Sequence, residues 1–244
     1  MEWIYLSPHF DDIALSCGGL VWEQVRAGDH ASVWTICAGR PPDVPLSPFA
    51  ELLHARWQTG PEAVELRRGE DIASCAQMGA AYRHFSIPDC IYRRSPLDGT
   101  ALYASEESIS GPLHPHEEPL IEALHAELDR ALPGAAELVS PLALGGHVDH
   151  RLTRAAAERL GRRLWYYADY PYVLRNAGQV EALRETGWQE DVFPISPQGL
   201  DAWERAVAAH ASQISTFWPD PEAMRLALHD YSYSMGGAAL WRAP

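Results

Sequence analysis

A strand, a helix and a second strand follow one another within the first forty residues. The apolar run Trp3-Ile4-Tyr5-Leu6 predicts a buried strand over residues 3–7. Apolar residues at helical spacing predict a helix from Ile13 to Ala27, which ends at Gly28, and residues 31–37 predict the second strand. Two strands joined through a helix form a parallel pair with a right-handed crossover. The sequence therefore predicts an α/β fold with a mostly parallel sheet flanked by helices.

The rest of the chain continues this alternation. Further strands are expected over residues 82–87, 137–140 and 164–168, and further helices over residues 65–78, 119–131 and 150–163. Polar, proline-rich stretches predict long loops over residues 39–63 and 93–118. The last third predicts two or three helices, one of them near residues 198–216. We expect a single Rossmann-like domain over residues 1–244, with a helical C-terminal layer.

Charge and composition exclude several classes of function. The net charge of −14 at pH 7 argues against a broad nucleic-acid interface, because such a surface cannot neutralise phosphates. All 19 basic residues are arginine. Without lysine there is no Schiff base, hence no ordinary pyridoxal-phosphate chemistry, and no P-loop lysine.

The four cysteines are scattered and form no C-x-x-C pair. We therefore expect buried free thiols in a reducing compartment, not a disulfide scaffold or a cysteine-rich zinc ribbon. No apolar stretch approaches the roughly 20 residues that a membrane span requires, and no secretory signal precedes the first strand. These features predict a cytoplasmic protein with no membrane span.

Two groups of histidine and aspartate each follow a predicted strand and precede a predicted helix. The first is His9, Asp11 and Asp12, and the second is His147-Val148-Asp149-His150. Ligands gather at the carboxyl ends of strands in open α/β sheets, so both groups are expected at one edge. Such a set suits Zn²⁺ with an open position for water, or Fe²⁺. The alternative is that the aspartates only cap helices and the histidines lie on the surface.

These motifs resemble the two signatures, H-P-D-D and H-x-D-H, of the PIG-L/LmbE-like family of zinc-dependent N-acetylglucosaminyl deacetylases. The similarity extends to Arg67-Arg68-Gly69-Glu70, to Pro88-Asp89 with Arg93, to the aromatic segment 166–172 and to Ser212-Gln213. It covers most of the chain in order. Two positions depart from the usual pattern, since Phe10 replaces a proline and Ile13 an acidic residue.

The resemblance implies a role for each matched residue. His9, Asp12 and His150 would bind zinc, and Asp11 would be the general base. His147 would stabilise or protonate the reacting centre, with Asp149 orienting it and keeping it protonated to higher pH than a free histidine. Arg67 would contact sugar hydroxyls, although a solvated helix arginine is an equal alternative.

Other polar and aromatic residues carry weaker expectations. Trp57, Tyr166, Tyr167, Tyr170 and Tyr172 could stack on sugar faces, but core packing is favoured for most of them. His114-Pro115-His116 is expected in an exposed loop and not at a second metal site.

The leading hypothesis is a zinc-dependent hydrolase that removes the N-acetyl or another N-acyl group from an N-acetylglucosamine-type sugar or glycoconjugate. The competing hypotheses are a metallo-amidase acting on a non-sugar amide and a non-catalytic sugar- or metal-binding member of the fold. The expected partner is a small-molecule amino sugar, with no nucleic acid. The sequence is also compatible with a homo-oligomer.

Overall fold

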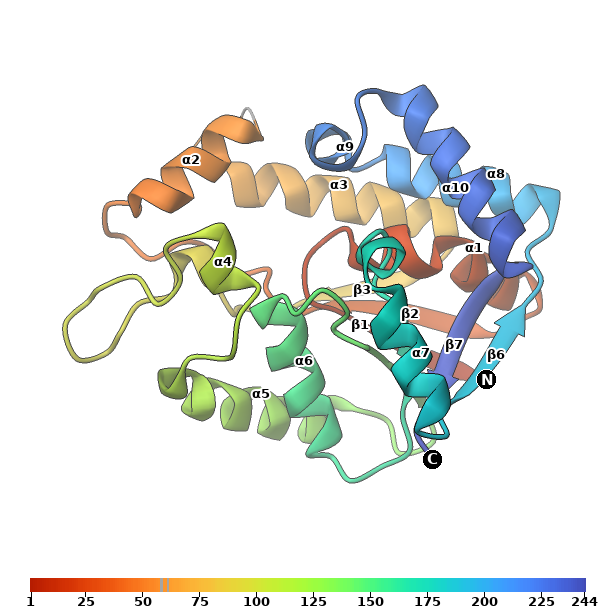
Figure 1. The fold of residues 1–244 in the computed structure, drawn as a ribbon, viewed down its shortest axis with the longest axis horizontal. Helices are drawn as coiled ribbons and strands as arrows, with labels where there is room; N and C mark the ends of the chain where they lie inside the picture. Colours follow the sequence, from red (N-terminus) through yellow and green to blue (C-terminus); the bar gives the residue numbers. More distant parts are fainter. Residues whose placement is uncertain (58, 61) are drawn as a thin grey trace.

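The computed structural model describes residues 1–57, 59–60 and 62–244, and its strands form one mixed sheet (Figure 1). Within these residues the sheet has seven strands in the order β3-β2-β1-β4-β5-β7-β6. The strands are β1 (Glu2–Ser7), β2 (His30–Thr35), β3 (Ala81–His84), β4 (Glu137–Pro141), β5 (Trp165–Tyr167), β6 (Gln189–Phe193) and β7 (Ala238–Arg242). The first five pair in parallel, which confirms the mostly parallel α/β sheet.

Helices cover both faces of the sheet. In Figure 1, α3 and α8 lie above it beside α1, while α5 and α6 lie below. The helices are α1 (Asp12–Arg26), α2 (Pro48–Arg56), α3 (Ala63–Met78), α4 (Glu106–Ile109), α5 (Glu118–Ala131), α6 (Val148–Glu158), α7 (Ala177–Glu185), α8 (Pro197–Ala208), α9 (Ala211–Phe217) and α10 (Pro221–Met235).

The two predicted loops contain helices. Residues 39–63 include α2, where the Ser47 side chain accepts from the Ala50 amide and Pro48 opens the helix. A serine N-cap and a proline at the first helical position are ordinary signals of a helix N-terminus. The many prolines of this segment nevertheless led to the prediction of a loop. Residues 93–118 include α4. Gln58 and Pro61, within the first predicted loop, lie outside the described residues.

The C-terminal third differs most from expectation. It contains the strands β6 and β7, which extend the sheet in antiparallel pairing beside β5, in addition to helices. The predicted helix near 198–216 is two helices, α8 and α9, interrupted around His210. Helix α6 ends at Glu158, five residues before its predicted end at Arg163.

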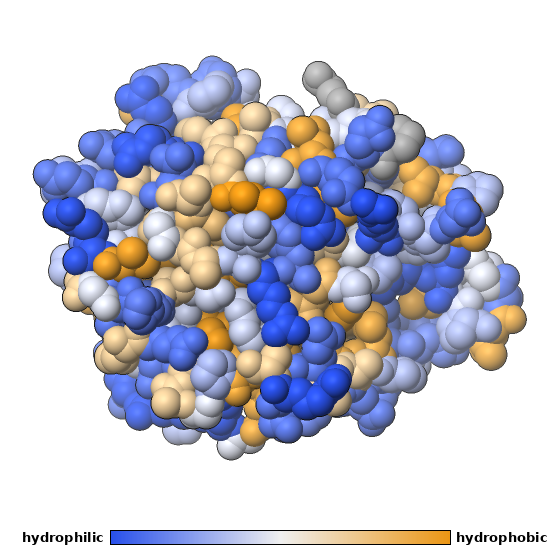
Figure 2. Space-filling view, turned by 180° about the vertical axis from the view of Figure 1, so that it is seen from behind, coloured by the Kyte–Doolittle hydropathy of each residue, from blue (hydrophilic) through white to orange (hydrophobic). Residues whose placement is uncertain are grey.

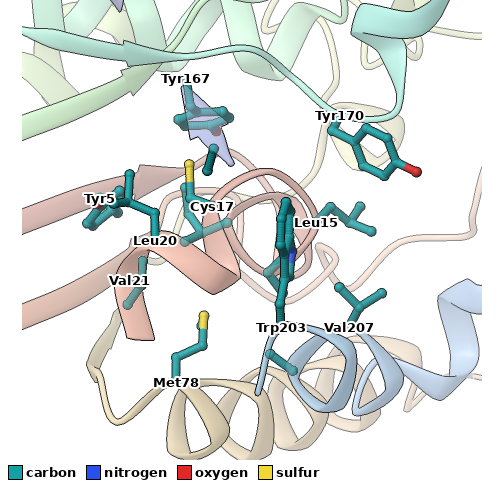
Figure 3. Close-up of a cluster of buried hydrophobic side chains, with 14 of the residues drawn as sticks. Tyr5, Leu15, Cys17, Leu20, Val21, Met78, Tyr167, Tyr170, Trp203 and Val207 are labelled. Carbon is teal, nitrogen blue, oxygen red and sulfur yellow. The ribbon is translucent and has the colours of Figure 1, made fainter. Parts of the chain in front are cut away.

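A large apolar cluster fills the space between α1, α8 and the sheet (Figure 3). Its centre is Trp203 of α8, which is fully buried and whose Nε1 donates to the carbonyl of Ala14 at 2.7 Å. A Cβ at Gly18 would lie 2.7 Å from Trp203 Cδ1, so the glycine lets the two helices approach. Gly18 and Gly19 together therefore allow α1 and α8 to pack closely.

The four cysteines are buried and free, as predicted. On the back of the molecule, apolar residues are interspersed among polar ones (Figure 2). Among the described residues, none of the helices combines the length and apolar character needed to cross a bilayer.

Candidate functional site

The two histidine and aspartate groups converge because β1 and β4 are parallel neighbours. His9 and Asp11 follow β1, and Asp12 begins α1, while His147 caps the first turn of α6 after β4. The ring centroids of His9 and His150 lie 5.4 Å apart, and those of His9 and His147 lie 4.8 Å apart. Side chains some 140 positions apart in the sequence therefore form one cluster.

Asp12 lies beside both His9 and His150, and His9, His147 and His150 each offer a ring nitrogen within 4.8 Å of those of the other two. Asp12 Oδ2 lies 3.4 Å from His9 Nδ1, and Asp12 Oδ1 lies 3.3 Å from His150 Nε2. His150 Nε2 is buried and, among the described residues, forms no hydrogen bond. A buried ring nitrogen that has no hydrogen-bond partner and lies next to a carboxylate is well placed to bind a metal ion.

The other nitrogen of each of these histidines is held by a further carboxylate. Asp149 Oδ2 lies 2.9 Å from His9 Nε2, and Asp169 Oδ1 lies 2.6 Å from His150 Nδ1. Both carboxylates are buried. Outer carboxylates of this kind fix the orientation and tautomer of histidines that bind a metal, so the residues present fit a divalent cation.

The electrostatics of the cluster favour positive charge. Burial by itself lowers the pKa of His150, but Asp12 and Asp169 raise it to about 10. Burial likewise opposes the charged form of His9, yet Asp12 and Asp149 raise its pKa well above the usual value. The carboxylates that stabilise imidazolium ions here would also stabilise a divalent cation.

His147 behaves differently from the expectation. Burial, together with the neighbouring His9 and His150, holds the pKa of His147 well below its usual value, so the expected raised pKa is wrong. The carboxylate of Asp149 binds His9 and the Cys90 amide, whereas only the Asp149 amide reaches His147, at Nδ1 (3.2 Å). Because Nδ1 accepts, the proton of the neutral ring is on Nε2.

Asp11 and Arg67 form a second pair beside the cluster. Arg67 Nη2 donates to Asp11 Oδ1 at 3.2 Å, and both side chains are almost buried. The guanidinium also lies over Phe10 and Trp57, 5.6 and 5.2 Å from the ring centroids. Arg67 is therefore a buried residue of the site and not a solvated helix residue.

A pocket of about 130 Å³ opens onto these groups. His9, Asp11, Asp12, Arg67, Asp89 and His147 form its polar part. Its remaining wall comes from α2, α4, α9 and the adjoining segments, namely Leu53, Arg56, Trp57, Ile91, Glu106, Ile109, Tyr172, Gln213, Thr216 and Phe217.

The aromatic residues considered for stacking divide between the pocket and the core. Trp57 and Tyr172 line the pocket, while Tyr166, Tyr167 and Tyr170 are buried in the core. Favouring core packing for most of them was therefore correct.

Sequence reasoning missed the contributions of Asp169 and Arg93. Asp169 directly follows the predicted strand over residues 164–168, which is the same signal that marks His9 and Asp11. The sequence marks Arg93 only through its motif with Pro88-Asp89. Its Nη1 lies 2.5 Å from Asp149 Oδ1, a contact between residues 56 positions apart that no local pattern reveals.

The chain is similar to known deacetylases. The chain is 30% identical over 191 residues to a 2'-N-acetylparomamine deacetylase of Streptomyces fradiae, covering 74% of this chain and 59% of the relative. It is also 30% identical over 201 residues to the protein of the same name in Niallia circulans, covering 69% and 66%. The chain thus spans about three-fifths to two-thirds of the length of these curated relatives.

Solved structures match over nearly the whole chain. The zinc-inhibited form of teicoplanin deacetylase Orf2 superposes with a TM-score of 0.79 at 28% identity, covering 99% of this chain and 97% of that one. The A40926 pseudoaglycone deacetylase Dbv21 gives a TM-score of 0.71 at 26% identity, covering 99% and 95%. The family model described as PIG-L, GlcNAc-PI de-N-acetylase, matches residues 4–160. The chain therefore belongs to the PIG-L family.

Proposed function

We propose that this protein is a zinc-dependent hydrolase that removes the acetyl group from an N-acetylated amino sugar or a glycoconjugate bearing one. The observation that carries the proposal is the convergence of His9, Asp12 and His150, each histidine backed by a buried carboxylate, at a pocket containing Asp11 and Arg67. We also propose that residues 1–244 form one deacetylase domain.

His9, Asp12 and His150 would hold the metal. A bound divalent cation polarises an amide carbonyl and can bring the pKa of water close to 7. Asp11 faces the same pocket and would accept the proton of the attacking water. His147, neutral and protonated at Nε2, would donate a hydrogen bond to the carbonyl oxygen as negative charge develops there.

Arg67 serves two purposes in this scheme. Its ion pair with Asp11 keeps the carboxylate oriented, and its guanidinium lines the pocket where sugar hydroxyls would lie. Proton transfer from Asp11 to the departing nitrogen would then complete the exchange, leaving acetate and a free amine. The water thus supplies a hydroxyl group to the acyl carbon and a hydrogen to the nitrogen.

The relatives support a sugar substrate. Two are named for 2'-N-acetylparomamine, and one solved structure is a deacetylase complex with teicoplanin. The wall of aromatic and aliphatic side chains around the polar floor offers surfaces on which a sugar ring could stack.

The test is acetate release from protein stripped of metal with a chelator and then reconstituted. One equivalent of Zn²⁺ or Fe²⁺ is added separately, because one structural relative is described in a zinc-inhibited form. N-acetylglucosamine, an N-acetylglucosamine glycoside and 2'-N-acetylparomamine are assayed beside a simple N-acetylated alkylamine. Metal-dependent release from the sugars supports the proposal. Release from the alkylamine alone indicates an amidase of non-sugar amides, and no release from any substrate at full metal occupancy indicates a binding protein.

A further inference from the structure

A buried chain of charges connects the cluster of histidines and carboxylates to Glu117, immediately before α5. Arg93 donates through Nε and Nη2 to the two oxygens of Glu117, both at 2.7 Å. Its Nη1 lies 2.5 Å from Asp149 Oδ1, and Asp149 Oδ2 lies 2.9 Å from His9 Nε2. Three consecutive contacts thus lead from Glu117 to a proposed metal ligand.

This chain is isolated from solvent. Glu117 is 1% exposed, Arg93 6% and Asp149 0%. Buried charges of this kind interact strongly because little water screens them, and they are costly unless they are paired. The Tyr103 hydroxyl also donates to Glu117 Oε2 at 3.2 Å, and the Arg93 Nη1 donates to the Pro88 carbonyl at 3.1 Å.

We propose that Glu117 is a positioning residue that sets the metal affinity of the site through Arg93, Asp149 and His9. The inference rests on the metal site of the proposed function. Two carboxylates and one guanidinium leave one net negative charge beside His9. Glu117 thereby offsets the positive charge of Arg93 and leaves the Asp149 carboxylate free to polarise the His9 ring toward a cation.

The bidentate geometry contributes as well. The planar guanidinium is held at two atoms by Glu117, which fixes the direction in which Nη1 meets Asp149. Asp149 in turn fixes the His9 ring. Without the Glu117 charge, Arg93 would draw electron density from Asp149 and add positive potential near the cation, so both effects weaken metal binding.

The substitution Glu117→Gln tests this directly, because it keeps the shape and removes the charge. The neighbouring Glu118→Gln is a matched control, since Glu118 is exposed and pairs with Arg159 at 2.7 Å on the surface. Zinc Kd is measured on folded, metal-free protein by competition with a chromophoric chelator. Burial raises the pKa of Glu117, so the titration is run at about pH 8, far above the ordinary pKa of a glutamate.

We expect Glu117→Gln to raise the zinc Kd by about tenfold, the lower end of the effect of outer-shell partners, and Glu118→Gln to leave it unchanged. A purely structural role for Glu117 would lower the melting temperature of the metal-free protein without changing the Kd, and that result overturns the inference. If Glu117→Gln does not fold, Tyr103→Phe removes one donor to Glu117 and is expected to change the zinc Kd by about twofold or more. An unchanged Kd in that variant also overturns it.

The zinc titration requires no substrate, so it separates this inference from the proposed function. Zinc binding that depends on Glu117 without any acetate release contradicts the proposed function alone. Acetate release by the parent protein, together with a zinc Kd that Glu117→Gln does not change, contradicts the inference alone.

Discussion

Helix α1 takes part in two buried regions of opposite character. Its middle packs through Gly18 and Gly19 on Trp203 in the apolar cluster of Figure 3. Its first turn supplies Asp12 to a cluster of histidines and carboxylates. Most side chains of both regions are buried. In the first, side chains are held by shape, and in the second they are held by paired charges and hydrogen bonds.

This difference separates stability from chemistry. Apolar clusters are close-packed, so a change of volume alters the free energy of unfolding. In the charged region a change of one atom alters which groups can bind a cation or accept a proton, with a smaller effect on packing. Substitutions in the two regions should therefore affect different measurements.

Asp12→Ala should have the largest effect. Asp12 lies within 3.4 Å of both His9 and His150, and its removal leaves two imidazoles without their shared carboxylate. We expect the zinc content, measured by elemental analysis, to fall to a small fraction of one equivalent, and acetate release to fall below detection. Full zinc occupancy in the variant would contradict the ligand role.

Asp11→Asn should affect turnover and not metal content. Asp11 contacts Arg67 but is absent from the proposed ligand set. Loss of a general base costs on the order of 10²–10⁴-fold in rate, which we expect in kcat at unchanged zinc content. Turnover equal to that of the parent protein would rule out Asp11 as the base.

Gly18→Ala should do the reverse. The added Cβ would lie 2.7 Å from a Trp203 side chain that is itself fixed by its hydrogen bond to Ala14. Overpacking of this kind costs about 1–3 kcal/mol of stability, measurable by urea denaturation, while kcat per folded molecule is unchanged. Gly69→Ala is the control, because among the described residues no atom beyond the chain neighbours and the helix's own backbone lies within 4 Å of a Cβ at that position. A comparable loss in both variants would show that backbone effects, not contact with Trp203, cause the destabilisation.

Glu106→Gln should have the smallest effect. Glu106 of α4 pairs with Arg56 of α2 at 2.8 Å across the pocket wall, and both side chains are about half exposed. Exposed ion pairs contribute less than about 1 kcal/mol, so the melting temperature should hardly change. We expect any kinetic change to appear in KM and not in kcat, since the pair lies away from the proposed reacting groups. A large loss of kcat would assign Glu106 to the chemistry.

Local sequence signals predicted the elements that carry the site. The apolar run before His9, the helical spacing after Asp12 and the strand before His147 each depend on neighbouring residues, and each appears in the structure. The pairing of β7 with β6 and with β5 was not predicted. Strand β7 begins some 45 residues after β6 and some 70 residues after β5, and local sequence patterns do not show such distant pairings. Helix α2 was missed because prolines that open or precede helices were counted as signs of a loop.

The sequence by itself determined which residue types stand at the ends of the first and fourth strands, and hence that carboxylates and imidazoles would gather at one edge of a parallel sheet. Only the tertiary structure decided which carboxylate serves which histidine. Asp149 was expected to orient His147 but holds His9, and Asp169 holds His150. The physical reason is that such pairings depend on side-chain directions set by contacts between distant segments, and spacing along the chain carries no information about those directions.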